Sequence, residues 1–337
     1  MRQRALLSIV LCAGAAAGCG SPEAAPSLGP RFSGTYDVRI VPTTVNGGPF
    51  DPAAPVAQPV TLRWVVQSSC VGDADACVAV AEPIEPAPSE SLAVSGLSQP
   101  GMGFVYEDDA WTRGIDPPAA TCRSAVDEQP IDEPWSALHL TELRPVDADG
   151  SGPIAGLTGD VTAVQGGTCS AVVNATITLT RTGEVPDGTA PPQRFEPLPA
   201  DPEPPGAVWR GAYEESTRPK STTVGDISTM RSATSRFVAT PFCTRDGLRC
   251  MVVLTSQPAK SATPPVFAWT GSAYERSSLG APVPCASGGT AIPHIIQHFE
   301  PVTPGTESSD LLGLSTRDVT GDCAVSGVWD VYWRHTG

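Results

Sequence analysis

Apolar and polar residues alternate with a period of two along most of the chain. Leu62, Trp64 and Val66 lie on one side of such a run, and residues 172–179 and 325–333 alternate in the same way. β-Branched and aromatic residues dominate these runs, and Pro, Gly, Asp and Ser interrupt them about every ten residues, which is typical of antiparallel strands. No capped amphipathic helix longer than about ten residues is predicted. The pattern therefore indicates an all-β protein.

The pattern occurs twice, in residues 31–183 and again in residues 209–337. In each half an arginine–aromatic pair, Arg63-Trp64 or Arg236-Phe237, is followed by two cysteines at the same intervals of six and seven residues. Two copies of about 150 residues are too long for solenoid repeats, so each is predicted to be a domain. We expect two homologous antiparallel β-sandwich or β-barrel domains in tandem, each of about seven to nine strands. Further matched positions are Phe104, Tyr106, Trp111, Leu157 and Gly183 in the first copy and Phe267, Trp269, Tyr274, Leu311 and Gly337 in the second.

Intervals that differ between the copies are predicted to be loops. From Cys77 to Cys122 the first copy is ten residues longer than the second copy from Cys250 to Cys285. Loops absorb such insertions because closure entropy grows slowly with length. Residues 184–208, between the copies, hold eight prolines, which predicts a semi-rigid linker without a core of its own.

The N-terminus has the character of a targeting signal. Basic Arg2 and Arg4 precede an apolar stretch, residues 5–17, that is too short to span a bilayer as a helix. The stretch ends in Ala16-Ala17-Gly18-Cys19. These residues resemble the lipobox of bacterial lipoproteins, in which a small residue precedes the cysteine that becomes the mature N-terminus. Alanine stands at position 16, where leucine is commoner.

The resemblance implies a signal peptide at 1–18, a diacylglyceryl group on Cys19, and a tether over 19–30. Stable anchoring then follows from two or three acyl chains. The alternative is ordinary signal cleavage and secretion. The lipobox and the high Gly and Pro content are similar to those of surface lipoproteins of GC-rich bacteria such as actinobacteria. We therefore expect the protein to be anchored at the extracytoplasmic face of the cell membrane.

The net charge of the chain restricts the kinds of partner that it can bind. Without the signal, 19 basic residues face 36 acidic ones, a net charge of −17. This balance argues against nucleic acid, whose phosphates require a basic face. It also argues against attraction to anionic lipid, so we expect membrane contact through the anchor alone.

The cysteines predict a disulfide framework. Of ten cysteines, Cys12 leaves with the signal and Cys19 carries the lipid, so four remain in each half. An even number in an exported chain is typical of disulfide bonding. The predicted bridges are Cys70–Cys77, Cys122–Cys169, Cys243–Cys250 and Cys285–Cys323.

Two segments are candidates for metal binding. Asp147, Asp149 and Ser151 stand at the first three ligand positions of a segment that resembles an EF-hand loop, but Thr158 occupies the place of the bidentate glutamate. The alternative is a turn whose side chains cap their own backbone. His294 and His298 lie four residues apart, on one face of either a helix or a strand. Zinc would require a third ligand such as Glu300; surface histidines on a strand are the alternative.

No catalytic residue and no cofactor are predicted. The sequence lacks a Gly-x-Ser-x-Gly elbow. The openings Phe32-Ser33-Gly34-Thr35-Tyr36 and 209–213 resemble the start of a lipocalin-type barrel; an edge strand is the alternative. We expect a non-enzymatic, lipid-anchored module that binds a partner protein, an envelope polymer or a small apolar ligand. The alternatives are a lipocalin-like carrier of a small apolar ligand and a secreted metal-dependent hydrolase that uses His294 and His298.

Overall fold

The computed structural model describes fifteen segments of the chain, and the structural statements below refer to these. They are 31–49, 58–70, 77–84, 92–117, 136–146, 152–190, 195, 197–201, 203–224, 230–258, 263–280, 282–285, 288–307, 309–321 and 325–337. In this part of the chain no helix is long and apolar enough to cross a membrane.

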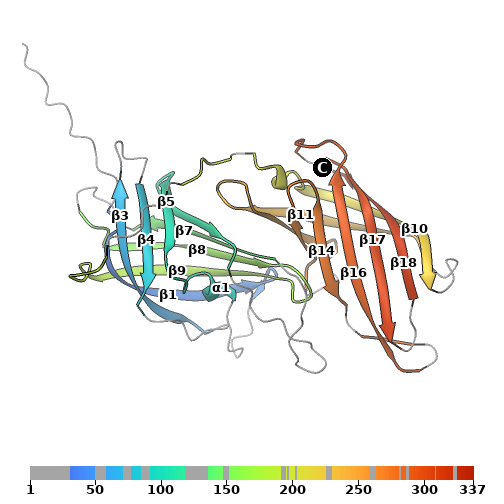
Figure 1. Cartoon of the computed structure of the whole chain (residues 1–337), viewed down its shortest axis with the longest axis horizontal. Helices are drawn as coiled ribbons and strands as arrows, with labels where there is room; N and C mark the ends of the chain where they lie inside the picture. The colour runs from blue at the N-terminus through green and yellow to red at the C-terminus, as the bar shows by residue number, and fades with distance from the viewer. Residues whose placement is uncertain are drawn as a thin grey trace, which may run out of the picture.

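The described residues of the first copy form a closed antiparallel barrel of eight strands (Figure 1). Strands that follow one another in the chain pair with each other, and β9 returns to pair with β1. A short strand, β2 (Gly48–Pro49), extends β1. The barrel strands are β1 (Gly34–Val45), β3 (Val60–Cys70), β4 (Cys77–Pro83), β5 (Met102–Glu107), β6 (Ala110–Ile115), β7 (Ala137–Pro145), β8 (Gly156–Gln165) and β9 (Ala171–Gly183).

The second copy repeats this topology. Its barrel closes through the β10–β18 and β14–β16 pairings, and β15 (Val283–Pro284) is a short addition to β16. Its strands are β10 (Gly211–Val224), β11 (Ala233–Cys243), β12 (Cys250–Ser256), β13 (Val266–Trp269), β14 (Tyr274–Leu279), β16 (Thr290–Pro301), β17 (Leu311–Gly321) and β18 (Val325–His335). The all-β, two-domain prediction is confirmed, and the choice that it left open is resolved in favour of up-and-down barrels.

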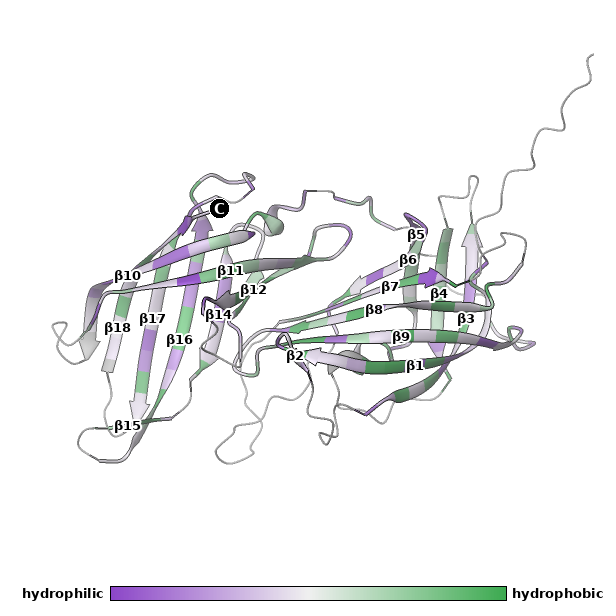
Figure 2. Ribbon diagram, turned by 180° about the vertical axis from the view of Figure 1, so that it is seen from behind, coloured by the Kyte–Doolittle hydropathy of each residue, from purple (hydrophilic) through white to green (hydrophobic). Residues whose placement is uncertain are grey.

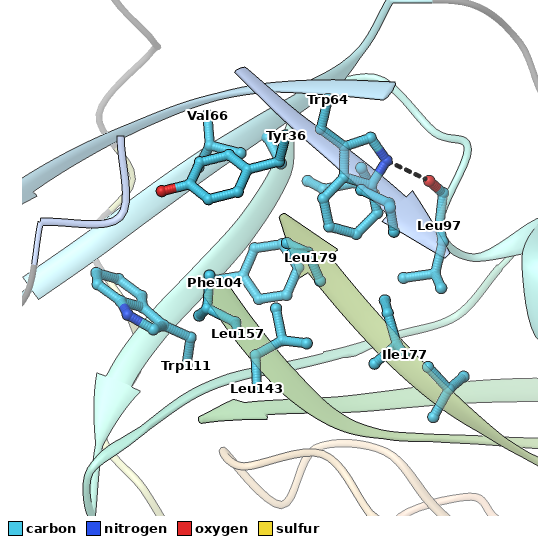
Figure 3. Packing of buried hydrophobic residues seen from close by; sticks show 14 of the residues in the cluster. Tyr36, Trp64, Val66, Leu97, Phe104, Trp111, Leu143, Leu157, Ile177 and Leu179 are labelled. Atoms are coloured by element: carbon cyan, nitrogen blue, oxygen red, sulfur yellow. Dashed lines mark hydrogen bonds between the residues drawn. The ribbon is translucent and has the colours of Figure 1, made fainter. Parts of the chain in front are cut away.

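Because side chains alternate across a strand, the period-two pattern sends every second residue into the barrel. Leu62, Trp64 and Val66 all lie in the core of the first barrel and are at most 5% exposed. Figure 2 shows apolar and polar residues alternating along the strands, and Figure 3 shows the packed interior. Burying a large apolar side chain contributes roughly 1.5–3 kcal/mol, so this interior is the main source of stability.

The opening segment of each copy closes one end of its barrel. Phe32 packs against three aromatic rings with centroids 5.3 to 5.9 Å away. Trp209 takes the same place in the second barrel. The following tyrosines reach across the barrel, where Tyr36 Oη donates to the Ile154 carbonyl (2.8 Å) and Tyr213 Oη to the Ser309 carbonyl (3.1 Å). The matched aromatic positions therefore contribute to the same core packing in both barrels.

The opposite end of the first barrel is filled by a short helix, α1 (Leu92–Ser95), in the connection from β4 to β5. From Cys77 to Phe104 the first copy is ten residues longer than the second from Cys250 to Phe267, so α1 belongs to the inserted segment. Val94 and Leu97 are fully buried, and the Leu97 carbonyl accepts a hydrogen bond from Trp64 Nε1 (3.2 Å; Figure 3). The insertion is a loop, as predicted, but it also completes the core.

Each barrel has a disulfide between neighbouring strands. Cys70 and Cys77 join the ends of β3 and β4, and Cys243 and Cys250 join the ends of β11 and β12, with Cα–Cα distances of 4.0 and 4.1 Å. These are the two short bridges that the spacing predicts. Cys169 and Cys285 are also disulfide-bonded. Their predicted partners, Cys122 and Cys323, lie outside the described residues.

The two barrels pack against each other through their outer faces. Met251, Val253 and Val266 of the second barrel form an apolar cluster with residues on β7 to β9 of the first. Polar contacts surround the cluster: Leu279 N donates to Thr168 Oγ1 (2.7 Å), and Ser170 Oγ to the Pro264 carbonyl (2.8 Å). The residues contributed by the first barrel are Leu138, Val164 and Val172.

The linker packs on the second barrel at its C-terminal end. A short 3₁₀ helix, η2 (Pro205–Ala207), packs on the second barrel, and Gly206 and Val208 are buried there. On the first barrel the ring of Phe195 lies against Gly103. The linker thus contributes packing residues to both domains.

Candidate functional site: the cavity of the second barrel

The second barrel holds a cavity of about 700 Å³. All eight of its strands contribute lining residues. The cavity lies between the aromatic cluster around Phe267 and Trp333 and the barrel end that carries Met230 and Val283. Sites for small molecules typically measure about 300–1,000 Å³, so the volume suits one small ligand.

Several inward positions that are apolar in the first barrel are polar in the second and line its cavity. Strand pairing aligns the two copies, since Tyr36 opposes Trp64 as Tyr213 opposes Phe237. In the first barrel the corresponding side chains belong to the packed core. The aligned pairs, first barrel and then second, are Val38 and Glu215, Ile40 and Thr217, Val161 and Ser315, and Ala163 and Arg317.

The same alignment shows that two matched arginines, Arg113 and Arg276, have different surroundings. Arg113 in the first barrel is 7% exposed, and its Nη1 donates to the Gly96 carbonyl just after α1 (2.7 Å). Burial lowers the pKa of Arg113 to about 10. The aligned residue of the second barrel, Arg276, instead lines the cavity and is half-buried. The inserted α1 segment thus supplies the acceptor that holds Arg113 in a filled barrel.

Arg276 is positioned by its neighbours in the barrel wall. Its Nη1 donates to Gln297 Oε1 (3.2 Å), and its guanidinium lies 6.0 Å from the centre of the Phe267 ring. Arg317 lies 5.6 Å from the centre of the Trp329 ring. Both arginines therefore stack on aromatic side chains that line the cavity, an arrangement that cation–π attraction favours.

Glu215 is the acidic residue of the cavity lining within the described part of the chain. Burial raises the pKa of its carboxyl group to about 7, against the opposing influence of the Arg276 charge. Removing a carboxylate from water disfavours its charged form, which explains the direction. Near neutral pH the cavity therefore holds a carboxyl group that changes its charge readily.

A second cavity of about 530 Å³ lies where the barrels meet. Asn46 and Val172 of the first barrel line it together with residues of the second. The two cavities share four lining residues, so they adjoin each other. The shared residues are Phe237, Leu254, Pro265 and Arg276. The space between the barrels thus offers a route to the interior of the second.

The structure places His294 and His298 on the outer face of β16 and does not bring them together. His294 Nε2 lies 2.8 Å from Ser277 Oγ, whereas His298 lies between Glu300 (3.2 Å) and Glu275 (3.0 Å). Hydrogen bonding to Glu300, and then to Glu275, raises the pKa of His298. Four residues along a strand span about 13 Å, so one zinc ion cannot bind both imidazoles in this arrangement.

Other predicted site residues lie outside the described residues: Cys19, Asp147, Asp149 and Ser151. Among the residues that are described, no cluster of three His, Cys, Asp or Glu side chains has the arrangement of a metal site. The sequence reasoning missed the polar residues of the cavity. Their signal was the appearance of Glu215, Ser315 and Arg317 at inward positions where the first copy has apolar side chains.

Fold and site define the chain as a tandem β-barrel protein with one filled barrel and one hollow barrel. No protein-family model and no curated protein match it. Among solved structures, the monomer form of the Mycobacterium tuberculosis PknI sensor domain is 18% identical with a TM-score of 0.32, covering 48% of this chain and 93% of that one. A putative AttH from Nitrosomonas europaea is 11% identical with a TM-score of 0.18, covering 89% and 92%.

Proposed function

We propose that this protein is a non-enzymatic binding module of the cell envelope that takes a small ligand into its second barrel. The observation that carries the proposal is the contrast between the two copies. The two copies share a sequence pattern and a topology. The first forms a barrel that is filled by α1 and apolar side chains, whereas the second forms a barrel with a cavity of about 700 Å³. A pocket of this size, with aromatic walls and a few polar groups, has the character of a small-molecule site.

The disulfides indicate an oxidising, extracytoplasmic compartment. We propose further that a lipid on Cys19 holds the protein at the membrane face. Intact mass of the detergent-extracted protein tests this. The expected mass carries a diacylglyceryl group, and the Cys19→Ser variant is expected in the aqueous fraction. An unmodified wild-type N-terminus at Cys19 or elsewhere would rule the anchor out.

The ligand cavity is tested with a neutral fluorescent probe, phenylnaphthylamine, whose emission rises in apolar surroundings. We expect saturable binding of one probe per chain. Ser315→Phe fills the cavity and is expected to weaken probe binding about tenfold or more, a loss of about 1.4 kcal/mol. Leu314→Phe is the matched control, because Leu314 is the neighbouring residue on β17 and is 39% exposed. Absence of saturable binding, or equal binding by both variants, would contradict the proposed function.

A further inference from the structure

The charge of the cavity is opposite to that of the chain. The chain carries a formal net charge of −15. Among the described residues, the cavity lining has three arginines, Arg231, Arg276 and Arg317, and one carboxyl group, Glu215. An acidic protein repels small anions at long range, so guanidinium groups gathered around the cavity reverse that field locally. Arg276 is half-buried there, and Arg231 and Arg317 are exposed.

Two of these arginines face the same part of the interior. Strand pairing sets Arg276 opposite Gln297, and Gln297 opposite Ser315. Arg317 is the next inward residue along β17 after Ser315. The β14, β16 and β17 strands thus bring both guanidinium groups to one wall of the cavity, and the stacking described above orients them.

The surroundings of Arg317 favour an external counter-ion. Within the described residues its guanidinium contacts the Trp329 ring and no carboxylate. A guanidinium presents planar donors that match the oxygens of an acidic group, often in pairs. The remaining wall, with Phe237, Trp329 and Trp333, is aromatic and suits an apolar body.

We propose that the cavity binds a small organic acid: an anionic group held by Arg276 and Arg317, and an apolar body packed among the aromatic rings. This inference rests on the proposed function and names the class of ligand for the same cavity. It differs from the lipocalin-like carrier of a small apolar ligand that the opening segments of the two copies suggest, because it requires an acidic group on the ligand.

The test compares two probes that share an aromatic skeleton. Anilinonaphthalene sulfonate carries an acidic group, and phenylnaphthylamine does not. We expect the sulfonate to bind the full mature chain about tenfold more tightly than the neutral probe, since a charge-assisted contact contributes about 1.5–3 kcal/mol. Arg276→Gln and Arg317→Gln are each expected to lower sulfonate affinity about tenfold and to leave neutral-probe affinity within about twofold.

Three controls make the result specific. Ser315→Phe is expected to weaken binding of both probes about tenfold or more, so that surface adsorption of the dye is not counted. Arg63→Gln removes an exposed arginine on the first barrel, paired with Asp37, and is expected to change neither affinity. Equal affinities for the two probes, or sulfonate binding that is unaffected by both arginine variants, would overturn the inference and leave the proposed function standing. Failure of both probes to bind would overturn the proposed function itself.

Discussion

At the scale of single residues, Glu215 shows how the hollow barrel differs from the filled one. It occupies the position of Val38, a core residue of the first barrel. A valine there requires only packing, whereas a carboxyl group must either keep contact with water or give up its charge. Its raised pKa, about 7, is therefore a consequence of placing a polar group at an inward position of a small barrel.

This pKa predicts how stability depends on pH. An unfolded glutamate has a pKa of about 4.3, so between roughly pH 4.5 and 7 the folded protein retains a proton at Glu215 that the unfolded chain has lost. Its contribution is favourable at acidic pH and is lost as pH rises through 7. Glu215→Gln removes the titration. We expect the variant to be more stable than wild type by about 2 kcal/mol at pH 8 and nearly equal to it at pH 4.

Urea unfolding at the two pH values measures the difference. Glu307→Gln is the control, because Glu307 is exposed and its nearest ionic partner, Arg210, is 3.9 Å away. A stabilisation of the same size at both pH values would show that Glu215→Gln acts through packing, and would contradict the shifted ionisation.

At the scale of elements, the connection between β4 and β5 decides whether a barrel is filled. Leu97 is fully buried, and its carbonyl is tied to Trp64. Leu97→Ala should cost about 2–5 kcal/mol, the range for leucine truncation in cores. Thermal unfolding measures the loss, and Leu198→Ala, at a position 53% exposed, should lie within about 0.5 kcal/mol of wild type. A neutral Leu97→Ala would mean that α1 is only a surface loop.

The strands themselves were predictable, because the alternation of Leu62, Trp64 and Val66 is a local property of the sequence. Closure was not, since it depends on β1 pairing with β9 and on β10 pairing with β18, segments that are more than 100 residues apart. The histidine pair illustrates the same limit. His294 and His298 share one face in a helix or a strand, and only the observed strand sets them about 13 Å apart.

The cavity was even harder to predict from the sequence than the closure of the barrels. An empty volume is a relation between many inward side chains, and it becomes visible only once the inward face of every strand is known. Alignment of the two copies contained part of the signal, since Thr217 and Ser315 replace larger apolar residues. The length of the inserted loop did not predict that the loop fills one barrel.

At the scale of the whole molecule, the barrels form one packed assembly through their outer faces. The run from Met251 to Leu254 is apolar at every position, and alternation sends Val252 and Leu254 into the barrel while Met251 and Val253 point outward. A strand that is apolar on both faces is typical of one covered on both sides. Here the first barrel covers the outer face of this strand. The Pro-rich linker by itself does not predict that the two barrels pack together.

Met251→Asp tests this packing. Met251 is 3% exposed, so an aspartate there places an unpaired charge in the apolar cluster, which disfavours the contact strongly. Each barrel retains its own core and disulfide, so we expect the barrels to separate while each stays folded. Small-angle scattering should show a larger radius of gyration, and near-UV circular dichroism should remain close to that of wild type. Val302→Asp, at a position 57% exposed on the second barrel, should change neither. An unchanged radius for Met251→Asp would mean that the apolar cluster is not what holds the barrels together.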